Sequence, residues 1–486
     1  MNYFYYSIFS ILFICNQVFS NDIIKRFDID DNIKPIGLKS VIQQGLYKNN
    51  DVKIREFQDQ LYDIQKIDLK DGFWLPQVTL SFSSTIQRLT EFRDVLGAET
   101  PTAPSAITQL DLGDYTVFNW GKDYLAYLNG LQTIKRNKQV LKEEQRKLKH
   151  KLITKYFKLV TKKEVETIYR NQLKHASFIY RLNREKASAK KVDKQAYYQA
   201  RSEFLRAQSK YYESVRKLDD THHELAYLIN DPPGTKYVIR EKLKYEKIKT
   251  NLDEMVSLSL GHSSEIISAH VNNEIAERSY EIARRSNWAL PEFTIDFGIQ
   301  NLSWTPSSFG QTYTTDTPPH IDLVVKLEAS WKLLGRDGFI NHRIINRATL
   351  NKGLTQHNII RQKHFVESKL HQHYNVVKNL EKQMITLEAR SENTRKTYDT
   401  ILDKYTKDKN LFLDFLHALR DYTDTEVTLA EVMNSHLFNK VELAKYTGVD
   451  DFGGNHFEDL AMKFLTLEES IIEEENQKIK KKEGKQ

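Results

Sequence analysis

The sequence predicts a mainly α-helical protein with a small β part, built from two similar halves. Residues 131–230 and 354–447 contain neither Gly nor Pro, and apolar residues recur in them every three to four positions, as in long amphipathic helices. Residues 293–300 and 321–333 instead alternate apolar and polar side chains, as in strands. The halves repeat one order of motifs at an offset of about 214 to 218 residues, which indicates a tandem duplication.

The first twenty residues have the pattern of a secretory signal peptide. Residues 3–15 are mainly apolar but too few to span a bilayer as a helix. Val18 and Ser20 occupy the −3 and −1 positions of a cleavage site, so we expect export and removal of this segment. The alternative is a lipoprotein signal at Cys15, which the bulky residues just before this cysteine disfavour.

Each half of the chain is expected to contain two strands followed by a helical hairpin. Polar interruptions at 186–193 and 407–410 divide the two long helical segments, and each segment is therefore predicted to fold back on itself. The expected organisation is a signal peptide (1–20), an N-terminal segment (21–37), a first repeat (38–231; strands about 75–93 and 107–119, hairpin 122–230), a linker (232–251), a second repeat (252–450; strands about 290–304 and 320–334, hairpin 336–447) and a flexible polar C-terminal tail (451–486).

The strands of the second half are predicted to have one apolar and one polar face. Lys326 and Glu328 fall on the polar face, and the length of the segment 321–333 suits a tilted strand that crosses a bilayer. A soluble hairpin with one buried face fits the same pattern. If the strands do meet lipid, the lipid-facing residues are Phe293, Ile295, Phe297, Ile321, Leu323, Val325, Leu327 and Trp331.

Composition and motifs disfavour several functional classes. The net charge of +7 over 486 residues does not indicate nucleic-acid binding, and a single cysteine excludes a disulfide framework. No phosphate-binding glycine loop, Gly-x-Ser-x-Gly elbow or His-Glu-x-x-His motif occurs. His357, His364 and His371 lie about 10.5 Å apart along a helix, too far for one metal ion. We therefore expect no catalytic residue, no cofactor and no metal.

In the order and spacing of its motifs, the sequence resembles the TolC family of outer-membrane efflux proteins over about residues 38–450. The residues that carry the resemblance are Leu75-Pro76 and Leu290-Pro291 before the first strands, Trp120-Gly121 and Leu334-Gly335 after the second strands, Glu-Leu-Ala at 224–226 and 442–444, and the segment 413–418. The resemblance implies a homotrimer in which long hairpins form a periplasmic α-barrel. Each protomer would add four strands to a twelve-stranded transmembrane β-barrel.

The function that this resemblance implies is export. The protein would be a passive duct, not an enzyme, in the outer membrane of a Gram-negative bacterium, in contact with outer-membrane lipid. It would pass substrates from the periplasm, or directly from the cytoplasm, within a tripartite multidrug efflux pump or a type I secretion system. Its partners would be a periplasmic adaptor (membrane fusion) protein and an inner-membrane pump of the resistance-nodulation-division or ABC type.

The resemblance also implies functional residues at the hairpin tips. Tyr405, Asp414 and His417 correspond to positions of a periplasmic gate, although His417 stands where the family has a second aspartate. Lys190 and Asp408 stand at the tips, where the family usually has glycine, and would contact the adaptor.

Basic residues are concentrated in one part of the chain. Residues 122–216 carry 25 Lys and Arg against 9 Asp and Glu. This excess is typical of a solvated helix face, and a basic tunnel wall that favours anionic cargo is a second interpretation; export argues against nucleic acid. The alternative function for the whole chain is a secreted or periplasmic coiled-coil scaffold without a pore, for which two-faced strands would have no use.

Overall fold

The computed structural model describes residues 33–75, 78–85, 105–188, 194–304, 322–333, 338–407, 412–451 and 456–463. The expected signal peptide lies outside the described residues. The prediction of a mainly helical chain with long helical hairpins and few strands is confirmed. None of the helices in the described ranges is long and apolar enough to cross a membrane.

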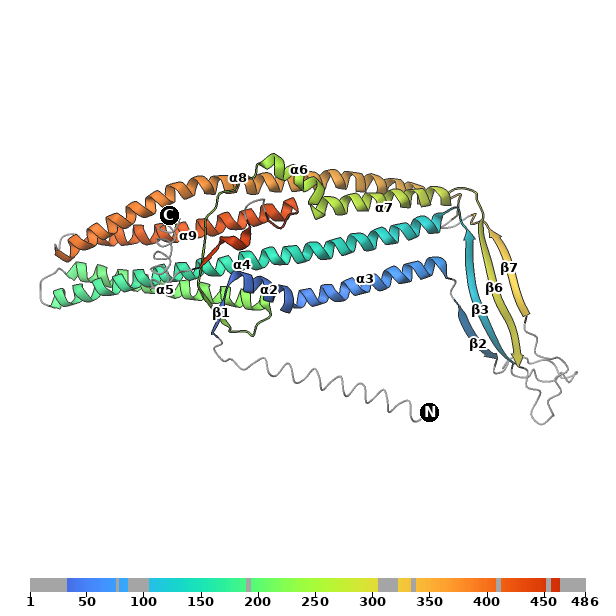
Figure 1. Ribbon diagram of the computed structural model, residues 1–486, viewed down its shortest axis with the longest axis horizontal. Coiled ribbons are helices and arrows are strands. Elements are labelled where there is room, and N and C mark those ends of the chain that lie inside the picture. The colour runs from blue at the N-terminus through green and yellow to red at the C-terminus, as the bar shows by residue number, and fades with distance from the viewer. Residues whose placement is uncertain are drawn as a thin grey trace, which may run out of the picture. The chain divides into compact units, whose positions relative to one another are not determined.

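The two repeats contain the same series of elements, and corresponding elements begin 213 to 221 residues apart (Figure 1). The first series is α2 (Leu38–Lys48), α3 (Asn50–Trp74), β2 (Thr79–Thr85), β3 (Ser105–Phe118), α4 (Lys122–Ser188) and α5 (Lys194–Ile229). The second series is α6 (Leu252–His262), α7 (Ser264–Ser286), β6 (Glu292–Trp304), β7 (Asp322–Ser330), α8 (Arg343–Lys407) and α9 (Phe412–Thr447).

The long helices α4 and α8 have 67 and 65 residues. Each is therefore about 100 Å long at 1.5 Å per residue. Helix α8 begins later than the expected residue 336, because residues 338–342 form a turn in which the Phe339 amide donates to the Lys332 carbonyl at 2.8 Å. Strand β7 ends at Ser330, so Trp331 lies just after the strand.

The chain divides into two compact units. The first comprises residues 1–57, 140–267 and 363–486, and the second comprises 58–139 and 268–362. Several helices run through both units, and each unit is described separately below.

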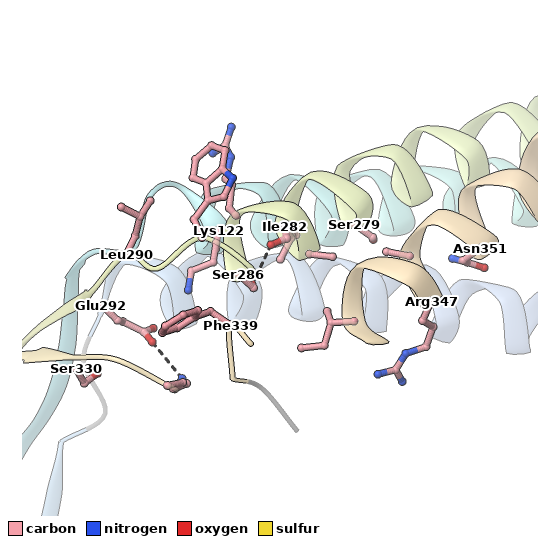
Figure 2. Close-up of a pocket in the computed structure, with 16 residues that line it drawn as sticks. Lys122, Ser279, Ile282, Ser286, Leu290, Glu292, Ser330, Phe339, Arg347 and Asn351 are labelled. Carbon is pink, nitrogen blue, oxygen red and sulfur yellow. Dashed lines mark hydrogen bonds and ion pairs between the residues drawn. The ribbon is translucent and has the colours of Figure 1, made fainter. Parts of the chain in front are cut away.

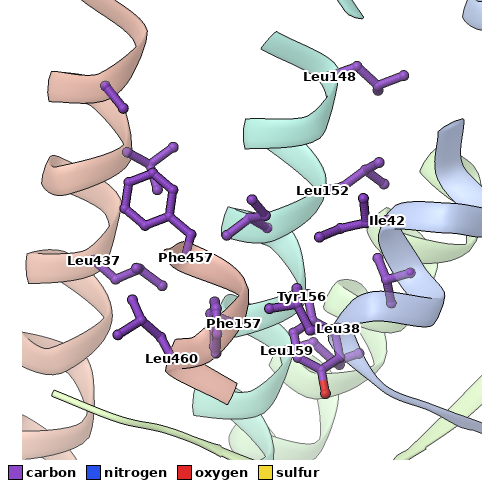
Figure 3. Packing of buried hydrophobic residues seen from close by; sticks show 14 of the residues in the cluster. Leu38, Ile42, Leu148, Leu152, Tyr156, Phe157, Leu159, Leu437, Phe457 and Leu460 are labelled. Carbon is purple, nitrogen blue, oxygen red and sulfur yellow. The ribbon is translucent and has the colours of Figure 1, made fainter. Parts of the chain in front are cut away.

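The first unit has a large apolar core. It is built mainly from α2, α4, α5 and α9, and Figure 3 shows part of it. The fully buried side chains include Leu38, Leu152, Tyr156, Phe157 and Leu225. The Tyr156 hydroxyl donates to Glu241 Oε2 at 2.5 Å, and the same carboxylate oxygen accepts the Leu38 amide at 3.0 Å, at the start of α2.

Two small sheets border this core, and they were not expected from the sequence. β1 (Ile33–Ile36) pairs in parallel with β4 (Lys236–Ile239), and β5 (Glu241–Leu243) pairs antiparallel with β8 (Ala461–Lys463). The segment 232–251, predicted to be a linker, therefore supplies a strand to each sheet.

The prediction of a flexible tail from residue 451 is wrong for residues 456–463. Phe457 and Leu460 lie on a short 3₁₀ helix, η3 (Phe457–Leu460), and are 0% and 3% exposed. They pack in the same cluster as Leu437 of α9 and Phe157 of α4 (Figure 3). Burial of these two apolar side chains contributes about 1.5–3 kcal/mol of stabilisation each. It therefore holds the segment in place, although the neighbouring residues in the sequence are polar.

The helices of the second unit lie side by side in the order α3, α4, α7, α8. The ring of Phe73 on α3 stacks on Tyr127 of α4 at 4.9 Å between centroids. Asn129 of α4 donates to Ser279 of α7 at 3.2 Å, and Thr355 of α8 donates to Asn273 of α7 at 3.2 Å.

The strands of the second unit form one antiparallel sheet in the order β2-β3-β6-β7. The order of the helices and the order of the strands both follow the chain. Within the described residues, α3 and β2 are therefore the first members, and α8 and β7 are the last.

Candidate functional site

The sheet of the second unit has an apolar face and a polar face. Directly opposed residues of an antiparallel pair project from the same face. In the β6–β7 register, one set of opposed pairs includes Phe293–Ala329 and Ile295–Leu327, and the other includes Glu292–Ser330 and Thr294–Glu328. The two sets alternate along the strands, so they lie on opposite faces.

The apolar face carries side chains that the protomer does not cover. Val325 and Leu327 are 57% and 70% exposed, and Trp331, beyond the end of β7, is 51% exposed. On the polar face the Lys326 ammonium pairs with Glu328 at 2.9 Å. Of the residues predicted to face lipid, Ile321 lies outside the described residues.

The end of the second hairpin contains a buried aromatic cluster in the first unit. Tyr405 of α8 is 3% exposed, and its ring stacks on Phe415 of α9 with 5.3 Å between centroids. Its hydroxyl accepts a hydrogen bond from Asn183 Nδ2 of α4 at 3.1 Å, and the Lys186 ammonium lies 5.7 Å from its ring centroid. Burial raises the pKa of Tyr405, so it remains a neutral hydrogen-bonding group. Tyr405 thus connects the second hairpin to the first within one protomer.

Asp414 and His417, the other two predicted gate residues, lie on the exposed side of α9. Phe415 and Leu416 between them point into the aromatic cluster, so the pair does not share the environment of Tyr405. Lys190 and Asp408, predicted at the hairpin tips, lie outside the described residues.

The exposed side of α9 forms a narrow acidic stripe. Its residues alternate at spacings of three and four, which keeps them on one face; they are Asp414, His417, Asp421, Asp424, Thr428 and Glu431. Lys210 pairs with Asp424 at 3.0 Å, and Lys162 pairs with Glu431 at 2.9 Å. The half of the stripe farther from the hairpin end is therefore partly neutralised by α4 and α5.

An ion pair between Glu203 of α5 and Arg420 of α9 was not found from the sequence. Glu203 of α5 is 3% exposed and accepts hydrogen bonds from two guanidinium nitrogens of Arg420 on α9. These hydrogen bonds raise the pKa of Arg420. The residues lie 217 positions apart, close to the repeat offset, but neither belongs to a motif that could have indicated the pair.

Comparison with known proteins identifies the fold. No protein-family model and no curated protein matches the sequence. Solved structures, however, match over most of their length, and they are outer-membrane channels.

Three of these structures illustrate the similarity. The CmeC outer membrane channel of Campylobacter jejuni matches with a TM-score of 0.70 and 16% identity, over 87% of this chain and 88% of that chain. The outer membrane protein VceC of Vibrio cholerae matches with a TM-score of 0.69 and 12% identity, over 85% of this chain and 96% of that chain. The MtrE outer membrane channel of Neisseria gonorrhoeae, in its open state, matches with a TM-score of 0.66 and 16% identity, over 85% of this chain and 89% of that chain. The chain therefore has the fold of the TolC-family outer-membrane channels.

Proposed function

We propose that the protein is a passive exit duct in the outer membrane of a Gram-negative bacterium, assembled as a homotrimer. The observation that carries this proposal is the two-faced sheet with uncovered apolar residues, in a chain that has the channel fold. Three copies would supply twelve strands to one β-barrel. The long hairpins would form the periplasmic tunnel.

The edges of the second unit support a closed ring of copies. α3 and β2 lie at one edge and α8 and β7 at the other, so two copies would meet through different edges. A head-to-tail contact of this kind generates a ring where the rotation between copies closes. Four strands are too few to enclose a pore. On the part of α3 that belongs to this unit, Leu61 and Ile64 are 55% and 53% exposed and lie three residues apart, so they form an apolar stripe. On α8, Leu350 and Leu354 are 76% and 66% exposed.

In this assembly one face of the sheet would contact lipid and the other would contact water. The apolar face, with Phe293, Ile295, Phe297, Ile321, Leu323, Val325 and Leu327, would contact outer-membrane lipid. Trp331, just after β7, would lie at the membrane boundary, where tryptophan is enriched. Lys326 and Glu328 would face the water-filled lumen.

The hairpin end would be the gate and the docking site for partners. Threefold symmetry would place three copies of Asp414 and three of His417 around one axis. Tyr405, with its buried bond to Asn183, would keep the two hairpins of a protomer together in the closed state. Lys190 and Asp408 would contact a periplasmic adaptor protein, and an inner-membrane pump of the resistance-nodulation-division or ABC type would deliver cargo.

Two measurements on one preparation test this proposal. The protein is purified from the outer-membrane fraction, its mass is determined by native mass spectrometry, and its conductance is recorded in a planar lipid bilayer. We expect a trimer that conducts. A soluble protein without conductance would instead indicate the pore-free coiled-coil scaffold.

A further inference from the structure

A cavity of about 570 Å³ lies in the second unit, where the sheet meets the helices. Figure 2 shows its lining, which comes from the start of α4, the end of α7, the strands β6 and β7, and the start of α8. The volume is within the range of small-molecule binding sites. Sequence reasoning did not find this site, because its lining comes from five separate parts of the chain.

The cavity is cationic. Its ionisable lining residues are Lys122, Arg285, Lys332 and Arg347, against the single carboxylate of Glu292. Glu292 is already paired with Lys332 at 3.1 Å, and Arg285 is held by Glu281 at 3.0 Å and by the Trp120 carbonyl at 2.7 Å. Among the described residues, Lys122 and Arg347 make no ion pair, so two positive charges are left for a ligand.

The rest of the lining is largely apolar. Ile282, Ala283, Leu290, Phe339 and Ile344 contribute to the wall, together with Trp288, which is 43% exposed. Lys122 and Phe339 both line this cavity and are labelled in Figure 2. A cavity of this composition can accept an anionic head together with an apolar body.

The cavity lies on the polar face of the sheet. Glu292 and Ser330 are directly opposed and belong to the polar face of the β6–β7 pair. Lys332 reaches the same face through its ion pair with Glu292. In the proposed assembly this face lines the lumen, so the cavity would open toward passing cargo and away from lipid.

We infer that this cavity is a cargo subsite for anionic amphiphiles, that is, small molecules with a phosphate or carboxylate attached to an aromatic or aliphatic body. The positive charges of Lys122 and Arg347 attract the anionic head, and the apolar wall takes the body. The subsite rests on the proposed duct and adds a substrate class to it.

The test uses 1-naphthyl phosphate as the probe, with 1-naphthol and inorganic phosphate as its two halves. Binding to the purified full-length protein is measured by isothermal titration calorimetry in neutral detergent at low salt. We expect the complete probe to bind at least tenfold more tightly than either half. Equal affinity for naphthol, or for inorganic phosphate, would overturn the inference.

Variants assign the binding to the cavity. The double variant Lys122→Gln/Arg347→Gln should weaken probe binding at least tenfold, whereas Lys135→Gln, an exposed lysine of α4 about 20 Å from Lys122 along the helix, should not change it. If the double variant does not fold by circular dichroism, the exposed Arg347→Gln alone should weaken binding at least threefold. Unchanged affinity in the folded variants would contradict the assignment.

The conductance of the same preparations separates this inference from the proposed function. A conducting trimer that does not bind the probe would refute the subsite and leave the duct intact. A protein that binds the probe but neither trimerises nor conducts would refute the duct, and with it the role of the cavity in cargo passage.

Discussion

Two buried histidines give the first unit a stability that depends on pH. His222 of α5 accepts the Tyr237 amide on Nδ1 at 3.2 Å, and His436 of α9 is 3% exposed with Nε2 3.6 Å from Glu381. Burial lowers the pKa of each histidine to about 4. Protonation of His222 would also break the hydrogen bond that fixes the start of β4.

Stability should therefore fall as the pH drops from about 6.5 to about 4. In this window the unfolded chain binds protons that the folded histidines do not, and each histidine adds a slope of about 1.4 kcal/mol per pH unit. His436 faces Lys440, Glu381 and Lys378, and these charges remain when it is replaced. Urea unfolding at several pH values gives the slope of the unfolding free energy against pH. In this window, His436→Gln and His222→Gln should each reduce that slope by the contribution of one proton. An unchanged slope would mean that these histidines titrate normally in the folded protein.

Gly448 is required by the end of α9. Its φ of +88° lies in the left-handed region, and a Cβ there would lie 2.3 Å from the His262 carbonyl oxygen. Gly448→Ala should therefore destabilise the protein by about 1–3 kcal/mol. Gly261→Ala, at a helical position with nothing within 4 Å, is the matched control and should stabilise slightly. Equal unfolding midpoints for the two variants would contradict this interpretation.

At the scale of single elements, two substitutions in strand β7 test which face of the sheet contacts lipid. Val325→Arg places a charge on the apolar face, which costs about 2–4 kcal/mol near the centre of a bilayer. Lys326→Gln changes the neighbouring residue on the polar face and should assemble normally. The yield of heat-resistant trimer on gel electrophoresis measures the difference. Equal yields would exclude contact between Val325 and lipid.

The stripe on α9 offers a second element-scale prediction. Asp414→Ala should weaken the block of conductance by divalent cations, because three carboxylates would be lost from the proposed gate. Recordings in planar lipid bilayers with divalent cations, made on the wild type and on Asp414→Ala, measure the block. Block that is the same in both proteins would place the gate elsewhere.

Elements were predictable from the sequence where a pattern ran for many residues. The long hairpin helices and the alternation of β6 and β7 follow from periods of 3.6 and 2. β1 and β8 were missed because strands of 4 and 3 residues show no period. Tyr405 was singled out through the family resemblance, but its partner Asn183 lies 222 residues away on another helix, and no local pattern connects them.

At the scale of the whole molecule, the apolar stripe of α3 should hold the assembly together. Ile64→Glu places a charge in the stripe, whereas Lys66→Glu places a carboxylate on an exposed α3 residue two positions further on, which lies on a different face. We expect Ile64→Glu to shift the protein from trimer to monomer in native mass spectrometry and Lys66→Glu to remain trimeric. Trimers in both variants would show that α3 does not form the contact between copies.

The pairing of β5 with β8 also constrains the order in which the chain can fold. Strand β5 ends at Leu243, but its partner β8 begins at Ala461. Phe457, just before β8, packs in the apolar core to which α4 of the first repeat also contributes. More than 200 residues must therefore be synthesised before this part of the core can close. Contacts of such high sequence separation form slowly. The first repeat consequently keeps part of its apolar surface uncovered until the end of the second repeat has been synthesised.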